Sequence, residues 1–229
     1  MLYNPFDPLF LVLVVPAMLF SMWAQFKVQS SFKKYSQQQT SKRLTGAQAA
    51  RAVLDDAGVT GVKIEAVAGN LTDHFDPKAN VIRLSDSVYN STSVAAVGVA
   101  AHEAGHAIQY ANHYAPMKLR AAIIPATNIG SKLSMPLVLI GLLMSMPGLI
   151  NIGIVLFGTV VIFQLITLPV EFNASSRAIK ILDNSALLAR DEVPASKKVL
   201  TAAALTYVGA LAVSLAQLLR LVLLSRGRR

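Results

Sequence analysis

Residues 94–112 read VAAVGVAAHEAGHAIQYAN, and the interpretation of the whole chain starts from this stretch. Ser91, Thr92 or Ser93 can cap a helix that begins here, and the small apolar residues that follow allow close packing against neighbouring helices. A helix places residues four apart on the same face, one turn from each other. The sequence therefore predicts a packed helix that presents the two histidines of HEAGH side by side.

HEAGH at 102–106 has the spacing of a metal site. His102 and His106 can bind one ion, while Glu103 falls about 100° round the helix, where its carboxylate reaches a water on the metal. Imidazole suits zinc, and zinc with three protein ligands lowers the pKa of its water to about 7. A chance match is disfavoured because the flanking residues are apolar. Two histidines and a glutamate buried there without a ligand would cost folding free energy. We expect two zinc ligands and a catalytic base, Glu103.

Few residues can supply the third ligand. Outside the motif the chain has only His74 and His113, and it has four glutamates in all. His113 follows His106 by seven residues, about 10 Å along a continuing helix, which is too far to bind the same ion. Glu171 follows two predicted membrane spans, so it returns to the side where HEAGH lies. We favour Glu171, and the alternative is a boundary carboxylate that is solvated or paired with Arg177.

The composition indicates a membrane protein with one modest polar domain. Of the 229 residues, 54% are hydrophobic, above the usual share for a soluble protein. The absence of cysteine excludes disulfides, thiolate ligands and a cysteine nucleophile. The net charge of +9 comes mainly from basic residues beside apolar segments, so it favours membrane orientation over nucleic-acid binding.

Apolar segments predict about four membrane helices, at 8–24, twice within 123–170 around the turn signal Pro147-Gly148, and at 199–224. The last could instead lie in the membrane surface. A cleavable signal peptide is the alternative for the first, but its leader carries Asp7 and no basic residue. Lysines and arginines after the first span place the polar domain in the cytoplasm, although a crossing last helix would leave basic residues outside.

The fold class predicted is a mainly α integral membrane protein with a small α+β domain. The capping-box spacing of Thr45 and Gln48 predicts a helix over 46–57. Alternating runs at 62–69 and 80–85 predict a small sheet or hairpin around the turn-rich LTDHFDPKA. We expect five segments: an anchor at 1–26, a cytoplasmic metalloprotease domain at 27–122, a transmembrane hairpin at 123–170, a helix with the third ligand at 171–198, and a C-terminal membrane helix with a basic tail at 199–229.

Three motifs carry a resemblance over nearly the whole chain. LTDHFDP (71–77), VAAHEAGHAIQ (99–109) and LPVEFNASSRA (168–178) resemble the bacterial YugP-like family of membrane-bound neutral zinc metallopeptidases. More distantly, HEAGH with EFNAS is similar to the HExxH and E-x-x-A-D arrangement of HtpX-like gluzincins and prenyl-protein proteases. In those relatives the later glutamate completes the zinc site. The resemblance thus implies a gluzincin-like domain with one zinc ion and with Glu171 as the third ligand.

The same resemblance implies roles for neighbouring residues. Ser175 stands where those relatives carry aspartate, so the expected hydrogen bond to a ligand must be weaker or come from another group such as Asn173. By similarity to gluzincins, the strand after LTDHFDP would lie along the cleft and pair with an extended substrate, which would let His74 stabilise the oxyanion. Arg177 could orient the ligand helix, hold a substrate carboxylate or meet lipid headgroups.

These observations predict a multi-pass zinc peptidase of the bacterial cell membrane, with its site on the cytoplasmic side near the bilayer. Its substrates would be proteins or peptides, including membrane proteins. The main rival is a non-catalytic membrane scaffold with a structural zinc, which would not need Glu103. A metal transporter is disfavoured because the spans contain hardly any ionisable residue except Arg220. An intramembrane protease is disfavoured because polar segments flank the HEAGH helix.

Overall fold

The computed structural model describes residues 7–226 and divides into two compact units. Within the described residues, unit 1 comprises 7–24, Lys118–Leu168 and 205–226. Unit 2 comprises Gln25–Met117 and Pro169–Ala204. The chain therefore leaves unit 2, passes through unit 1 and returns, and the five-segment division remains a prediction.

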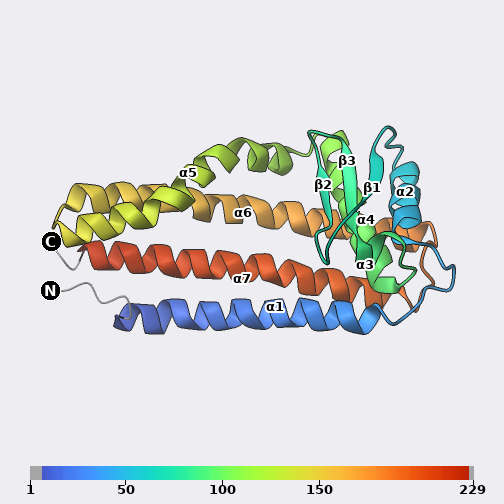
Figure 1. Cartoon of the computed structure of the whole chain (residues 1–229), viewed down its shortest axis with the longest axis horizontal. Helices are drawn as coiled ribbons and strands as arrows, with labels where there is room; N and C mark the ends of the chain where they lie inside the picture. Colours follow the sequence, from blue (N-terminus) through green and yellow to red (C-terminus); the bar gives the residue numbers. More distant parts are fainter. Residues whose placement is uncertain (1–6, 227–229) are drawn as a thin grey trace. The chain divides into compact units, whose positions relative to one another are not determined.

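Among residues 7–226, four helical stretches are long and apolar enough to cross a membrane (Figure 1). They are the π-helix η1 (Phe10–Val14) continued by α1 (Val15–Tyr35), then α5 (Ala115–Leu143), α6 (Pro147–Asn184) and α7 (Val193–Arg226). Large apolar side chains face outward, with Val12 70% and Val155 73% exposed. That pattern suits lipid rather than water. The prediction of a mainly helical fold with about four membrane helices is confirmed.

The long helices extend beyond the predicted apolar runs. Residues 171–198 do not form one helix, because α6 ends at Asn184 and α7 begins at Val193. Glu171 thus lies within α6, in the same helix as the second span of the hairpin. One helix, α6, therefore contains both the second span of the hairpin and the glutamate.

Helices α5 and α6 approach closely through glycines. A Cβ on Gly153 would lie 2.7 Å from the carbonyl oxygen of Ser134, and one on Gly141 would lie 2.8 Å from the nitrogen of Ile150. Small residues allow such backbone contact between membrane helices. The turn falls where Pro147-Gly148 predicted it, since α6 begins at Pro147 and proline suits the first helical position.

A buried ion pair joins the residues just before η1 to α7 within unit 1. Arg220 is 2% exposed, and its Nε and Nη2 donate to Oδ2 of Asp7 at 3.0 and 2.6 Å. Its guanidinium also lies 5.2 Å from the centre of the Phe10 ring. An arginine in an apolar span needs such a counter-ion, so the pairing explains the one charge that interrupts the apolar part of α7.

Unit 2 contains a three-stranded sheet of β1 (Lys63–Val67), β2 (His74–Asp76) and β3 (Val81–Ser85) in the order β1-β3-β2. Strand β3 runs parallel to β1 and antiparallel to β2. The two predicted strands are present, but they do not form a hairpin, and the turn-rich segment contributes β2. Because β3 is central, it has no open edge for the substrate pairing expected from the gluzincin resemblance, whereas β2 lies at an edge of the sheet.

Helix α4 (Val94–Ala111) is the centre of the unit 2 core. Ser93 caps it by accepting from the nitrogen of Ala96, and most of its small apolar residues are fully buried. Helices α2 (Gly46–Asp56) and α3 (Asp86–Tyr89) pack against it. The predicted capping box of Thr45 and Gln48 is present at the start of α2. The HEAGH motif is therefore held in a helix that neighbours enclose on most sides.

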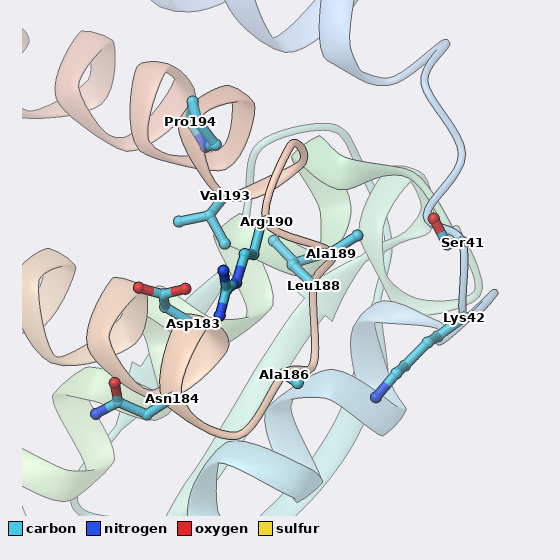
Figure 2. Close-up of a pocket in the computed structure, with 10 residues that line it drawn as sticks. All are labelled: Ser41, Lys42, Asp183, Asn184, Ala186, Leu188, Ala189, Arg190, Val193 and Pro194. Atoms are coloured by element: carbon cyan, nitrogen blue, oxygen red, sulfur yellow. The ribbon is translucent and has the colours of Figure 1, made fainter.

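The loop between α6 and α7 is tied to the segment that follows α1. Glu192 is buried and accepts from the backbone nitrogen and Oγ of Ser41 and from the nitrogen of Ala189. Burial would raise the pKa of Glu192, but these hydrogen bonds hold it below its usual value. Figure 2 shows the cavity of about 960 Å³ beside this junction, with Lys42 and Arg190 among its lining residues.

Breaking the Asp7–Arg220 pair should destabilise the protein strongly. Asp7→Asn leaves the arginine charge buried, and we expect a loss of about 3 kcal/mol in unfolding free energy, measured by denaturant titration in detergent. The double variant Asp7→Leu/Arg220→Leu removes both charges and should recover most of that loss. Asp55→Asn, on the exposed side of α2, is the control. A double variant as unstable as Asp7→Asn would contradict the ion-pair account.

Candidate metal centre

Helix α4 presents two histidines on one face. His102 and His106 lie one turn apart, and the centres of their rings are 4.6 Å apart with the ring planes at 80°. His106 is buried and His102 is half-buried. Their spacing lets both rings reach one ion, as the i, i+4 relation predicts.

Glu171 joins them from α6. Its Oε2 lies 3.3 Å from Nε2 of His102 and 3.3 Å from Nε2 of His106, and the three candidate ligand atoms lie within 4.8 Å of one another. Glu171 is 2% exposed, so it is not a solvated boundary carboxylate. Two imidazole nitrogens and one carboxylate oxygen match the His₂Glu set of catalytic zinc sites. The structure brings the three predicted ligands together, and their binding of zinc remains a prediction.

Each histidine is also held at its other ring nitrogen. Nδ1 of His106 lies 3.0 Å from Oε1 of Gln109, and Nδ1 of His102 lies 3.1 Å from Oγ of Ser175. An amide oxygen only accepts, so Nδ1 of His106 carries the proton and its Nε2 directs a lone pair toward the Glu171 oxygen when the ring is neutral. A lone pair and a carboxylate oxygen at 3.3 Å repel each other unless a cation or a proton lies between them. The site therefore fits a metal ion.

Gln109 was missed by the sequence analysis, although it lies in the quoted motif three residues after His106. It is fully buried, and its Nε2 donates to the carbonyl oxygen of Val170 at 2.7 Å and to Oδ1 of Asn173 at 3.0 Å. These two bonds fix which end of the amide faces His106. Gln109 thus links one candidate ligand to the helix that carries another, which is the usual arrangement around metal-binding histidines.

Asn173, Ser175 and Arg177, which the sequence placed around the site, all lie in this network. Ser175 contacts His102 directly, at the position where relatives carry aspartate. Asn173 touches neither histidine and accepts from Gln109 and from Nε of Arg177, the latter at 2.7 Å. The Arg177 guanidinium also lies 5.9 Å from the centre of the Tyr114 ring. Arg177 therefore orients Asn173 rather than pairing with Glu171.

The two predicted catalytic residues differ in position. Glu103 is 8% exposed, and among residues 7–226 its carboxylate makes no hydrogen bond or ion pair. Its charge nevertheless acts on His106. His74 is exposed on β2, lies outside the ligand cluster, and has Nδ1 2.8 Å from the carbonyl oxygen of Thr72. The geometry leaves Glu103 available to a water and leaves His74 on the edge strand.

Comparisons with known proteins identify the family of this chain. A family model described as "Putative neutral zinc metallopeptidase" matches residues 10–226. The chain belongs to this family. It is also 49% identical over 216 residues to "Putative membrane protease YugP" of Bacillus subtilis (strain 168), which covers 94% of this chain and 96% of the relative. No solved structure matches. The resemblance inferred from the three motifs is confirmed, and the match includes both helices that carry the candidate ligands.

In this family member, the glycine of HEAGH sets the distance between α4 and α6. A Cβ on Gly105 would lie 2.6 Å from the carbonyl oxygen of Ala174, closer than real Cβ contacts come. The obstacle is backbone, which cannot rotate away as a side chain can. Gly105 therefore lets Glu171, one turn before the contact point, come within reach of both histidines.

Protons should compete with a metal at His106. Burial alone would lower the pKa of His106, but the hydrogen bond to Glu171 and the charges of Glu103 and Glu171 raise it above its usual value. Metal binding requires the neutral ring. Binding should therefore weaken as the pH falls through that raised pKa, at a higher pH than for an ordinary histidine.

Replacing Gly105 with alanine should separate the two helices. Alanine favours a helix by roughly 1 kcal/mol, yet the clash with Ala174 should cost about 1–3 kcal/mol and weaken zinc binding by at least about tenfold. Zinc affinity can be measured by competition with a chromophoric chelator. Gly158→Ala is the matched control, because Gly158 also lies in a helix but has open space where the Cβ would be. Unchanged zinc affinity in Gly105→Ala would contradict the role of this contact.

Gln109 should tune the metal through His106. Gln109→Leu removes the acceptor for Nδ1, and we expect zinc affinity to fall about 10–100-fold. Gln109→Glu restores an acceptor and should recover part of the affinity, although it loses the amide donor to Val170. Chelator competition on both variants separates the two effects. Equal affinity for the leucine and glutamate variants would show that Gln109 acts only through packing.

Proposed function

We propose that this protein is a membrane-bound zinc peptidase that hydrolyses peptide bonds by an activated water. His102, His106 and Glu171 would hold one zinc ion, and Glu103 would act as general base. The convergence of three ligand atoms within 4.8 Å carries this proposal. The adjacent Glu103 carboxylate, which no other described side chain engages, adds to its support.

The chain's own residues account for the proton transfers. Zinc would supply a Lewis acid that polarises the substrate carbonyl and acidifies a water. Glu103 takes a proton from that water as its oxygen adds to the carbonyl carbon. The carbon–nitrogen bond then breaks, and Glu103 returns the proton to the leaving amine nitrogen. No covalent bond to the enzyme forms, which agrees with the lack of cysteine.

The chain order supports a site on one side of the membrane, close to it. The two parts of unit 2 are separated by Lys118–Leu168, which holds the spanning parts of α5 and α6, so two crossings return the chain to the same side. Lys27, Lys33 and Lys34 lie in the later part of α1, after its apolar run, which supports a cytoplasmic location for that side. Glu171 comes three residues after Leu168, where the second segment of unit 1 ends. Peptides and the membrane-proximal tails of proteins are the substrates that such a site can reach.

The edge strand β2 is the proposed binding place for the substrate backbone. It packs on α4, where the rings of Phe75 and Tyr110 are 5.8 Å apart, and its outer edge pairs with no other strand among residues 7–226. A substrate strand can add there through main-chain hydrogen bonds. If His74 stabilises the oxyanion, it must do so as an imidazolium, because its Nδ1 proton already faces the Thr72 carbonyl.

Zinc content and hydrolysis should separate under matched substitutions. Glu103→Gln should keep stoichiometric zinc and lose cleavage of a casein substrate by at least about a hundredfold, because the base alone is removed. Glu171→Ala should lose the metal and therefore cleavage as well. Both quantities can be measured on detergent-solubilised protein by elemental analysis and by release of labelled peptide.

Glu65→Gln is the matched control, because Glu65 lies on β1 with a half-exposed side chain that only meets Arg83. It should behave as the unmodified protein. A protein that binds zinc but cleaves nothing, equally inert with and without Glu103, would instead be a scaffold with a structural zinc.

A further inference from the structure

A groove runs between α6 and α7 within unit 2, beside the candidate metal centre. Its volume is about 250 Å³. Neither the ligand set nor Glu103 lines it, although Ser175 does. The residues that line it are Phe172, Ser175, Ser176, Ile179, Lys180, Lys197, Leu200, Thr201 and Ala204.

The lining changes from apolar to cationic along the groove. The two helices run antiparallel there, because α6 passes into a short loop that leads to α7. Phe172 and Ala204 therefore share one end, and Lys180 and Lys197 share the other. At about 1.5 Å per residue, the two ends are roughly 12 Å apart on α6. Between them stand the hydroxyl groups of Ser176 and Thr201.

The apolar end lies next along the chain to the parts of α6 and α7 that belong to unit 1. Phe172 comes four residues after Leu168, the last residue of unit 1 on α6. Ala204 directly precedes Leu205, where unit 1 resumes on α7. The apolar end is therefore the end nearer to the long apolar parts of both helices, where the acyl chains of a lipid would lie, and the cationic end is farther from them.

The cationic end lacks a protein partner. No acidic residue lines the groove, and neither Lys180 nor Lys197 forms an ion pair with any residue in 7–226. Both lysines are exposed, and Arg177 and Lys198 lie close in sequence to add positive potential. An anion placed between the two lysines would offset their mutual repulsion.

We propose that this groove binds one anionic phospholipid. Its phosphate contacts Lys180 and Lys197, its glycerol oxygens face Ser176 and Thr201, and its first acyl carbons lie against Phe172 and Leu200. The volume is below the roughly 300 Å³ of pockets that enclose a whole small ligand. It therefore suits a headgroup whose chains remain in the bilayer.

The position of Ser175 connects this lipid to the metal centre. Ser175 lines the groove and its Oγ contacts Nδ1 of His102. A bound lipid would exclude water from one side of that contact. The lipid site itself does not depend on peptidase activity, so the two proposals can fail separately.

The test measures lipid retention by the full-length protein. Purified protein in neutral detergent is titrated with phosphatidylglycerol or phosphatidylcholine and bound lipid is counted by native mass spectrometry. We expect one tightly held phosphatidylglycerol and little phosphatidylcholine. Lys180→Gln/Lys197→Gln should weaken retention by roughly fivefold per lysine. Zinc content and melting temperature of this variant should match those of the unmodified protein.

Lys33→Gln/Lys34→Gln is the matched control, because it removes the same charge from exposed lysines at the end of α1. It should retain lipid normally. Equal losses in both variants, or equal retention of the two lipids, would overturn the site in favour of diffuse attraction. Displacement by millimolar glycerol phosphate alone would overturn the lipid as occupant. A photoreactive phosphatidylglycerol should label 172–180 and 197–204, and labelling confined to other segments would also refute the proposal.

Discussion

The backbone contact between Gly105 of α4 and Ala174 of α6 is the constraint on which the metal centre depends. The two candidate histidines and the candidate glutamate belong to helices that are far apart in the sequence. Glu171 approaches both histidines only because nothing larger than hydrogen separates the helices at this point. The glycine lies between the two histidines in HEAGH. The same helical turn therefore carries two candidate ligands and leaves the space that the third, Glu171, needs.

Where helices pack closely around polar groups, those groups must form hydrogen bonds or ion pairs. Gln109 meets this requirement in unit 2, where one buried amide serves His106, Asn173 and the Val170 carbonyl. Arg220 and Asp7 meet it in unit 1 by pairing in an apolar span. In both units these polar groups connect segments that are distant in the sequence. The packed structure is thus specified by a few directional contacts in addition to apolar burial.

The sequence predicted the elements whose signals are local or strongly periodic. HEAGH spacing located the histidines, the even number of spans located Glu171, and the capping box located the start of α2. The sequence did not predict β2, because a three-residue strand is defined by its partner and not by its own composition. Gln109 escaped notice because a glutamine in a buried helix face has no distinctive spacing. The sequence analysis used Asp7 only as an argument against a signal peptide. Its pairing with Arg220 was not predicted, because the two residues are 213 positions apart.

The passage of the chain through α5 and α6 before it reaches Glu171 imposes an order on biosynthesis. A ribosome completes the HEAGH helix first, and at that stage the chain has two of the three candidate ligands. The third emerges only after the hairpin has been synthesised and enters the bilayer. A nascent or misinserted chain would therefore lack a complete metal site. Any activity that needs all three candidate ligands would therefore begin only after the hairpin has entered the bilayer.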